Sequence, residues 1–402
     1  MTSFVTVTLG DVATFIRGIT FKPEDVVPVG TENSVACLRT KNVQAELDLR
    51  DVWAVDRSLV RRNDQFLQEG DILISSANSW NLVGKCSWIP ALPWKTSFGG
   101  FVSVLRANPE HVYPRFLFWW FSSTRIQAMA RSFGNKTTSI SNLNVDRCLE
   151  LSLDLPSLQE QVRISSILDQ AECLRAKRRE AIFNLDALAQ EVFIDVFGDP
   201  SSSQKKWEVK KLSELVLEFR YGTSEKSGGE DIPVLRIPNI AKGDVDISDL
   251  KFVSLGVKDY ERLLLKEGDI LFVRSNGNPE FVGRCAVFEQ GSCGRGFVYA
   301  SYLIRARLSQ DVVSPYYLRE FLLGRTARQS LLANSKTSAG QYNINIQGLG
   351  SIDVPVPPLT LQEEFSRRLS AIKDMKKLYL NDLSKLEALF TSLQIRAFRG
   401  EL

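Results

Sequence analysis

The chain of 402 residues is 44% hydrophobic and 24% charged, with a formal net charge of +3. This length and apolar content predict two or three domains with ordinary cores, and the near-neutral charge excludes a protein that binds nucleic acid through bulk charge alone. Because no cationic segment leads into an apolar one at the start, and no run of 18 apolar residues occurs, the sequence predicts a cytoplasmic protein without a membrane span.

Residues 1–156 are predicted to form a mixed α and β domain. Short β-rich runs are separated by Gly, Asn and Pro turns, as in DILISS at 71–76 and FVSVLRA at 101–107. One amphipathic helix is expected to start after Pro114 and to end near Arg131. We therefore expect a curved sheet covered by at least one helix, and the pattern leaves the strand order open.

A long helix is predicted within residues 157–200. Neither Pro nor Gly interrupts the segment from Ser157 to Phe197, and Gly198 and Pro200 follow as a stop signal. Apolar side chains recur in steps of three and four, which is typical of a coiled-coil seam. The predicted seam residues are Ile164, Ile167, Ala171, Leu174, Ala181, Leu185, Leu188 and Val192.

Residues 201–357 repeat the first domain. LQEGDIL at 67–73 is matched by LKEGDIL at 265–271, and VGKC at 83–86 is matched by VGRC at 282–285. The flanking segments keep nearly the same spacing, so one unit of about 200 residues occurs twice. We expect a second mixed α and β domain here.

A second long helix is predicted within residues 358–402, with the same register as the first. Arg178 and Lys376 occupy the one seam position in each helix that interrupts the apolar pattern. The predicted seam residues of this helix are Phe365, Leu369, Ile372, Tyr379, Leu383, Leu386, Phe390 and Leu393.

The two helices are predicted to pair with each other. A helix of this length spans roughly 60 Å, too long to hide its apolar face against a small domain. Antiparallel pairing would return the C-terminus to the first domain and create a pseudo-two-fold axis; the alternative, each helix docked on its own domain, stays open. The predicted fold class is α+β, a tandem duplication of a mixed α/β domain with a curved β-sheet, each copy followed by a long helix of an antiparallel coiled coil.

Polar residues at loop-like places in both copies are suited to contacts with phosphates and base edges. Residues 76–82 and 275–281, and the turns at 137–142 and 337–343, differ between the copies while their flanks agree. One framework that reads two different sequences would produce this pattern. The candidate DNA-binding residues are Arg39, Lys41, Asn42, Ser75, Ser76, Asn78, Lys85, Lys136, Thr137, Arg236, Asn239, Arg274, Ser275, Asn276, Arg284, Lys336, Thr337 and Gln341.

The sequence lacks the residue groups that catalysis or metal binding would need. One histidine and six cysteines without a CxxC pair leave no metal site, and no Gly-rich phosphate loop occurs. NPEF at 278–281 approaches the polar-Pro-Pro-aromatic motif that holds a target amine in methyltransferases, but it lies in a turn that the first copy does not share. We therefore predict a chain that is not an enzyme, with no catalytic residue, metal or cofactor.

This order of elements resembles the DNA specificity subunit of type I restriction-modification systems. The resemblance rests on two variable domains, on EGDIL at the strand entry of each, and on long helices entered through LPSLQEQ at 155–161 and PPLTLQEE at 357–364. It implies that residues 1–156 and 201–357 are target recognition domains, each reading one half of a split, asymmetric sequence in double-stranded DNA. It also implies that the helices at 157–200 and 358–402 are spacers that fix the gap between the halves.

The resemblance further implies the partners of this chain. Two modification subunits would bind S-adenosylmethionine and methylate adenine, and ATP-dependent restriction subunits would join them in the full complex. Two alternatives stay open: a self-sufficient adenine DNA methyltransferase that uses NPEF, and a coiled-coil protein adaptor that does not read DNA.

Overall fold

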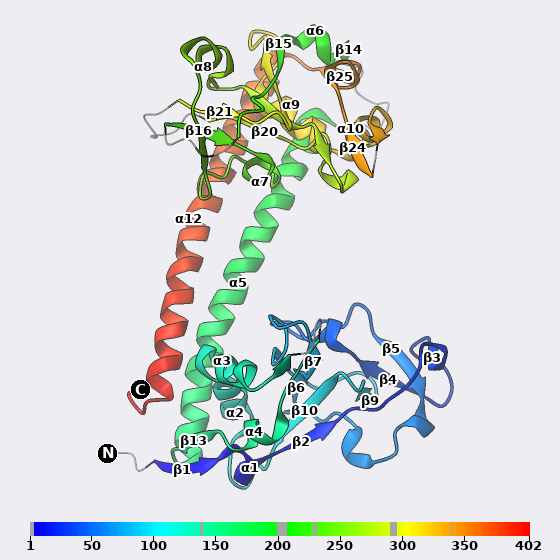
Figure 1. The fold of residues 1–402 in the computed structure, drawn as a ribbon, viewed down its shortest axis with the longest axis vertical. Coiled ribbons are helices and arrows are strands. Elements are labelled where there is room, and N and C mark those ends of the chain that lie inside the picture. The colour runs from blue at the N-terminus through cyan, green and yellow to red at the C-terminus, as the bar shows by residue number, and fades with distance from the viewer. Residues whose placement is uncertain are drawn as a thin grey trace. The chain divides into compact units, whose positions relative to one another are not determined.

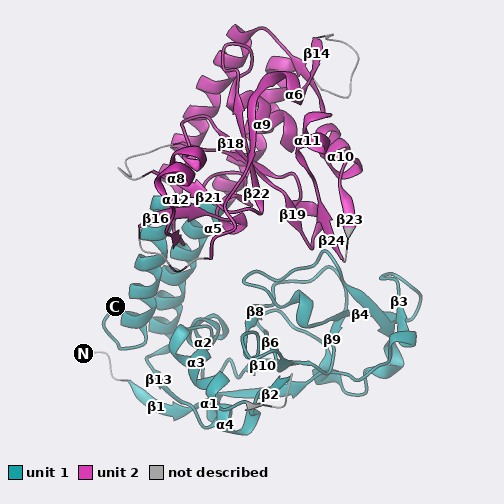
Figure 2. Ribbon diagram, turned by 45° about the horizontal axis from the view of Figure 1, so that its top comes forward, with its two compact units in different colours: residues 1–179, 381–402 teal, residues 180–380 magenta. Residues whose placement is uncertain are grey.

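The structure is a computed structural model that describes residues 4–136, 140–198, 207–226, 228, 231–289, 296–338 and 340–402. The chain divides into two units (Figure 2): unit 1 contains Met1–Arg179 and Asn381–Leu402, and unit 2 contains Glu180–Leu380. Each unit combines one copy of the duplicated domain with part of each long helix.

Unit 1 contains the elements up to the middle of α5 and the last part of α12 (Figure 1). Its helices are α1 (Leu9–Val12), α2 (Pro114–Phe121), α3 (Thr124–Ser132), α4 (Val145–Leu149), and parts of α5 (Leu158–Phe197) and α12 (Leu359–Ala397). Its strands are β1 (Val5–Thr8), β2 (Ala13–Arg17), β3 (Val26–Val27), β4 (Ser34–Leu38), β5 (Trp53–Asp56), β6 (Ile72–Ser75), β7 (Ala77–Asn78), β8 (Cys86–Trp88), β9 (Thr96–Phe98), β10 (Val102–Ala107), β11 (Asn135–Lys136), β12 (Ser141–Asn142) and β13 (Ser152–Leu155). Short 3-10 helices lie at Pro23–Asp25, Thr40–Asn42, Arg57–Leu59 and Asn63–Gln65.

Unit 2 contains the remaining parts of α5 and α12 and the second domain. Its other helices are α6 (Leu212–Leu215), α7 (Ile237–Ile240), α8 (Val257–Leu263), α9 (Pro315–Leu323), α10 (Arg325–Ala333) and α11 (Ile346–Gly350), with a 3-10 helix at Pro279–Phe281. Its strands are β14 (Glu208–Lys211), β15 (Val216–Tyr221), β16 (Ile232–Leu235), β17 (Lys251–Val253), β18 (Ile270–Val273), β19 (Ser275–Asn276), β20 (Cys285–Val287), β21 (Val298–Tyr299), β22 (Leu303–Leu308), β23 (Lys336–Ser338), β24 (Gln341–Asn343) and β25 (Asp353–Val356).

The sheets of the two units correspond, except that β3 of unit 1 has no counterpart among the described strands of unit 2. The antiparallel sheet β2-β10-β6-β8 of unit 1 has the same order as β15-β22-β18-β20 of unit 2. In both units a further strand has one antiparallel and one parallel neighbour. In unit 1, β4 pairs antiparallel with β5 and parallel with β9. In unit 2, β16 pairs antiparallel with β17 and parallel with β21. The pairs β1-β13 and β14-β25 join the ends of each domain. The predicted tandem duplication of a mixed α and β domain is confirmed.

The apolar run after each EGD turn is buried on both faces of its strand. Ile72 and Ile74 of β6 face the core that α2 and α5 complete, whereas Leu73 belongs to a second core around Phe98. A strand that is covered on both faces needs consecutive apolar residues instead of alternating apolar and polar ones. The segment DILIS supplies such a run. In unit 2, β18 is divided in the same way between two cores.

The single amphipathic helix predicted after Pro114 is wrong, because two helices occupy this segment in each unit. α2 ends before Ser123, whose backbone is extended (φ −64°, ψ 144°), and α3 begins after it. Gly324 has the same conformation between α9 and α10 (φ −66°, ψ 155°). The break is two residues long in unit 1 and one residue long in unit 2. Such a short break disturbs the apolar spacing little, so periodicity alone did not reveal it.

The aspartate of each EGD turn forms a buried ion pair with the neighbouring strand. The Asp71 carboxylate accepts two hydrogen bonds from Arg106 of β10, from Nε and Nη2 at 2.7 Å each, and one from the Gln68 backbone N–H at 2.8 Å. Asp269 accepts the same set from Arg307 at 2.8 and 2.6 Å and from the Lys266 N–H at 2.8 Å. These turns are therefore structural.

The long helices α5 and α12 run side by side and antiparallel within each unit (Figure 1). In unit 1, Arg163 near the start of α5 donates to the backbone oxygen of Leu402, and Arg178 pairs with Asp382 at 3.6 Å. In unit 2, Lys376 pairs with Asp186 at 2.5 Å, and Arg368 lies 3.3 Å from Asp195. The predicted antiparallel direction is confirmed.

Arg178 and Lys376, the residues that interrupt the two apolar seams, thus each find a carboxylate on the opposite helix.

The helices also pack against the domains, so the alternative of docking on the domain holds in part. Ile164 and Leu168 of α5 and Phe390 of α12 belong to the core of unit 1. Phe193 of α5 and Phe365 of α12 belong to the core of unit 2, where their rings contact each other at 5.5 Å between centroids. Each domain core is completed by both helices.

The predicted seam is wrong at two of its eight positions in α5 and agrees with the burial of α12. Leu174 and Leu188 are 53% and 39% exposed, so they do not lie in a buried seam. Leu168, one residue after the predicted Ile167, is completely buried, whereas Ile167 is half-buried. The other predicted residues of α5, and all those of α12, are buried or half-buried: Ile164, Ile167, Ala171, Ala181, Leu185, Val192, Phe365, Leu369, Ile372, Tyr379, Leu383, Leu386, Phe390 and Leu393.

A buried glutamine fixes the entry of each long helix. The Gln161 side chain accepts from the Tyr113 backbone N–H at 2.8 Å and donates to the Pro156 carbonyl at 2.9 Å. Gln362 repeats both contacts, with the Ser314 N–H at 2.7 Å and the Pro357 carbonyl at 2.7 Å. Gln161, the last residue of LQEQ, and Gln362, the second residue of LQEE, therefore tie the start of each long helix to the start of α2 or α9.

We expect the substitution Gln161→Ala to lower the free energy of unfolding by about 1–3 kcal/mol, because it leaves a partly buried backbone N–H and a carbonyl without partners. Urea denaturation of the purified chain measures this. The neighbouring Gln159→Ala, at an exposed position, is the matched control and should change stability by less than about 0.5 kcal/mol. Equal stability of the two variants would contradict the assigned role.

Candidate nucleic-acid interface

The segments that differ between the copies come together in a small sheet in each unit. In unit 1, β7 pairs with β12 through Ser141 opposite Asn78, and β12 pairs with β11. In unit 2, β19 pairs with β24 through Asn276 opposite Tyr342, and β24 pairs with β23 (Figure 2). Residues 76–82 and 275–281 thus lie beside the turns that follow α3 and α10.

A third segment, the turn before β10 or β22, joins this sheet through the backbone. The Phe101 carbonyl accepts from the Ser76 N–H at 3.0 Å and from the Ala77 N–H at 3.1 Å. In unit 2, the Tyr302 carbonyl accepts from the Arg274 N–H at 2.8 Å. We call these three segments the turn surface: residues 76–82, 99–101 and 140–142 in unit 1, and 274–281, 300–302 and 340–343 in unit 2.

Several predicted DNA-binding residues lie on or beside the turn surface. Arg274 is half-buried, with its guanidinium 4.8 Å from the Tyr221 ring centroid and its Nη1 donating to the Ser301 carbonyl at 3.4 Å. Asn78 is half-buried and donates to the Ser75 hydroxyl at 3.1 Å. Ser76 and Asn276 are half-buried, and Lys336, Thr337 and Gln341 are exposed. Lys136 lies in β11, and Thr137 lies outside the described residues.

Other predicted residues hold the fold together and are not free for DNA. Asn42 is 1% exposed, and its Nδ2 donates to the carbonyls of Asp48 and Asp51 at 2.7 and 3.0 Å. Asn239 makes the same two contacts with carbonyls in unit 2, at 2.8 and 3.0 Å. The prediction that Asn42 and Asn239 bind DNA is therefore wrong, because each closes its own loop. The prediction is also corrected for Ser75 and Ser275, because both are buried, at 1% and 9% exposed.

Five predicted cations away from the turn surface have partners within their own unit: Arg39, Lys41, Lys85, Arg236 and Arg284. The Arg39 guanidinium lies 3.4 Å from the Trp53 ring centroid and 3.2 Å from Asp51, which also pairs with Lys41 at 2.6 Å. Arg236 pairs with Asp249 at 3.0 Å. The Lys85 Nζ donates to Gln44 Oε1 at 2.6 Å, and Arg284 donates to the Ala241 carbonyl at 3.1 Å. Lys41 is the most exposed of these, at 64% of its side chain.

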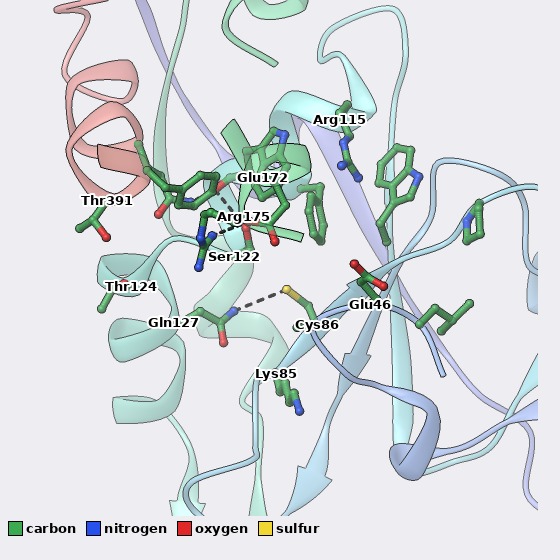
Figure 3. A pocket seen from close by; sticks show the side chains of 18 of the residues that line it. Glu46, Lys85, Cys86, Arg115, Ser122, Thr124, Gln127, Glu172, Arg175 and Thr391 are labelled. Atoms are coloured by element: carbon green, nitrogen blue, oxygen red, sulfur yellow. Dashed lines mark hydrogen bonds and ion pairs between the residues drawn. The ribbon is translucent and has the colours of Figure 1, made fainter. Parts of the chain in front are cut away.

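A cavity of about 650 Å³ in unit 1 lies between α2, α3, α5, α12 and the loop at 45–49 (Figure 3). Its arginines are paired: Arg115 donates to Asp169 at 2.6 Å, and Arg179 lies 3.2 Å from Glu172. Burial raises the pKa of the Cys86 thiol to about 12, so this thiol stays protonated at neutral pH. Cys86 is therefore not an activated nucleophile.

The segment that approaches a methyltransferase motif is a structural turn. The Asn278 side-chain oxygen accepts from the Glu280 backbone N–H at 2.9 Å, which caps the 3-10 helix Pro279–Phe281. Among the residues that the structure describes, no three His, Cys, Asp or Glu side chains are grouped so as to hold a metal ion. Within the same described ranges, no helix is both long enough and apolar enough to cross a lipid bilayer.

Phe101 and Tyr302 are members of the turn surface that sequence reasoning missed. Phe101 was included in the predicted β-rich run FVSVLRA, whereas it lies in a turn just before β10, and Tyr302 lies in the equivalent turn before β22. The turns GGF at 99–101 and ASY at 300–302 share little except the aromatic residue. An aromatic residue kept where the neighbouring residues differ is the signal that could have revealed them.

The chain matches known proteins along nearly its whole length. The model of the type I restriction modification DNA specificity domain matches residues 1–182 and again residues 204–388. The Type I restriction enzyme EcoKI specificity subunit of Escherichia coli (strain K12) is 30% identical over 97% of this chain and 87% of its own length. The Type I restriction enzyme StySPI specificity subunit of Salmonella potsdam is 26% identical over 99% of this chain and 89% of its own length.

Solved structures of such proteins share the fold. A type I restriction-modification S subunit from M. genitalium, 15% identical, superimposes with a TM-score of 0.55 over 99% of this chain and 96% of that one. A chain from a study of complex assembly and conformational transition of the type I R-M system, also 15% identical, gives a TM-score of 0.57 over 99% of this chain and 98% of that one. The two family matches together cover far more than half of the residues, and the chain belongs to the type I restriction-modification DNA specificity family.

Proposed function

We propose that the chain is the DNA specificity subunit of a type I restriction-modification complex, and that each unit reads one half of a split, asymmetric target in double-stranded DNA. The observation that carries this proposal is the turn surface. The same three segments meet in both units, on the same backbone framework, with different side chains.

Ser76 and Arg274 illustrate how one framework would read two sequences. Their carbonyls accept from the N–H groups of Leu143 and Ile344, at 2.8 and 2.9 Å, so the two residues hold equivalent backbone positions. A serine hydroxyl can donate or accept, whereas an arginine guanidinium only donates and pairs well with guanine O6 and N7. The two units would therefore select different bases at this position.

The chain itself would supply no chemistry. Two modification subunits would bind S-adenosylmethionine and methylate adenine, and ATP-dependent restriction subunits would complete the complex. Asn278 caps a 3-10 helix, and the arginines of the cavity in unit 1 are paired. Both observations support a role in reading the DNA sequence in place of catalysis. This chain would hold no cofactor of its own.

The paired helices α5 and α12 would act as the spacer between the half-sites. Joining two weak readers through a stiff connector raises the effective concentration of the second reader once the first is bound. The spacer would also fix the number of bases between the two halves.

The test uses the chain alone and the chain assembled with its modification subunit. Sequencing methylated adenines in cells that carry the intact system gives the target, and duplexes with either half scrambled serve as controls at one fixed salt concentration. We expect the assembled complex to prefer the intact target by about 10³-fold or more. The chain alone should transfer no methyl group and should bind no S-adenosylmethionine in calorimetry.

Two results would contradict the proposal. Methylation by the chain alone would make it a self-sufficient adenine methyltransferase. Binding by the assembled complex that ignores the target sequence would make it a protein adaptor.

A further inference from the structure

Phe101 and Tyr302 expose large aromatic side chains at equivalent places on the turn surface. They are 66% and 61% exposed, although Phe98 and Tyr299, three residues earlier in each unit, are completely buried. One exposed aromatic residue on a protein surface is ordinary. Its presence at the same place in two copies whose neighbouring segments differ indicates a shared use.

The turn that carries each aromatic residue is held rigidly by the backbone. The Ile19 N–H donates to the Phe98 carbonyl at 2.8 Å, and the Val102 N–H closes the turn on Gly99 at 2.9 Å. In unit 2, the Thr223 N–H donates to Tyr299 at 2.9 Å, and the Leu303 N–H closes the turn on Ala300 at 2.9 Å. Neither turn needs to become ordered before it can bind.

A glycine beside each turn is required by the close approach of the two chain segments. A Cβ atom on Gly18 would lie 2.3 Å from the Gly99 carbonyl oxygen, and a Cβ atom on Gly222 would lie 2.2 Å from that of Tyr299. Any larger residue would push the aromatic turn out of place. Both copies thus keep a glycine where it positions an exposed aromatic ring.

A polar side chain that differs between the copies lies beside each ring, as expected for a surface that reads bases. Each aromatic carbonyl is bonded to the residue that differs between the copies, Ser76 or Arg274, so each ring lies beside a candidate base-reading side chain. Arg274 also provides positive charge next to Tyr302. Aromatic side chains can contact the thymine methyl group or wedge against a base step, and they do so without pairing any polar group.

We propose that Phe101 and Tyr302 each make apolar contact with bases of one DNA half-site, and that they anchor the turn surface in the groove while its polar residues read base edges. This inference rests on the proposed function and names the residues through which it would work. An aromatic side chain has only two rotatable side-chain bonds, so an anchor on a rigid turn loses little conformational entropy on binding.

The test measures the affinity of the assembled complex for a fluorescent target duplex with Phe101→Ala, Tyr302→Ala and both together. We expect each single substitution to weaken binding by about tenfold, as for other contacts between bases and aromatic residues. Phe101→Tyr and Tyr302→Phe should keep nearly full affinity, because both retain the ring. The controls Val5→Ala and Val257→Ala remove apolar side chains that are 60% and 74% exposed outside the turn surface, and should leave affinity unchanged.

A second measurement separates anchoring from a loss of folding. Phe101→Ala should reduce discrimination against changes in one half of the target, and Tyr302→Ala against changes in the other half. Misfolding would instead weaken binding to every duplex. Circular dichroism and thermal melting check for misfolding, and an unchanged melting temperature of the variant excludes it.

Each negative result identifies what has failed. A wild-type complex without sequence preference would overturn the proposed function. A wild-type complex with sequence preference, whose alanine variants bind as tightly as the two valine controls, would overturn only this inference. Loss of complex assembly in size-exclusion chromatography, with folding intact, would show that the rings contact a protein subunit and would also overturn it.

Discussion

Removing one heptad from each long helix should weaken binding of the assembled complex to its natural target by about 100-fold or more, because each base pair that is no longer read costs about 1–3 kcal/mol. The deletions are residues 175–181 of α5 and 383–389 of α12. Each shortens its helix by about 10 Å, and seven residues turn the remaining helix by only about 20°, so the seams stay in phase. The shortened spacer would span about three base pairs fewer than the target provides.

The structure suggests these segments because they contact each other through residues of unit 1. Arg179 in the first segment lies 3.5 Å from Glu387 in the second, so both partners are removed together. The length-preserving control exchanges the two segments, since each has seven residues. This control should keep its preference for the natural gap. Unchanged affinity of the double-deletion variant for that gap, with normal helix content, would contradict the spacer role.

The duplicated fold could be predicted from the sequence because the repeat fixes which elements correspond. The α12 seam was predicted well, since Phe365 and Leu369 have no adjacent apolar residue that offers a competing register. In α5 the neighbours Ile167 and Leu168 are both apolar, and the less buried one was chosen. Periodicity cannot decide between adjacent apolar residues, because they differ by only one step around the helix.

The candidate site was predicted only in part, because polar side chains that close loops resemble those that bind ligands. Asn42 and Asn239 are matched between the copies, as functional residues could be, yet they satisfy carbonyls within their own loops. The differing turns were the better guide. Their contact through β7 and β12, or β19 and β24, is a long-range pairing that no local pattern in the sequence specifies.

The substitution Asp71→Ala should lower the free energy of unfolding of unit 1 by about 3–5 kcal/mol, because it leaves the largely buried Arg106 guanidinium without its counter-ion. The same change removes the acceptor of the Gln68 N–H in the EGD turn. Urea denaturation followed by tryptophan fluorescence measures the loss. This signal reports mainly on unit 1, since all tryptophans except Trp207 lie there.

The duplicated turn supplies its own controls for this prediction. Glu69→Ala removes an exposed carboxylate from the same turn and should change stability by less than about 0.5 kcal/mol. Replacing both members of the pair, Asp71→Leu with Arg106→Met, should recover much of the loss, since an apolar pair of similar volume leaves no buried charge unpaired. The loss of stability comes from burying the unpaired Arg106 charge and not from losing the acidic residue itself. A double variant that is as unstable as Asp71→Ala would therefore contradict this explanation.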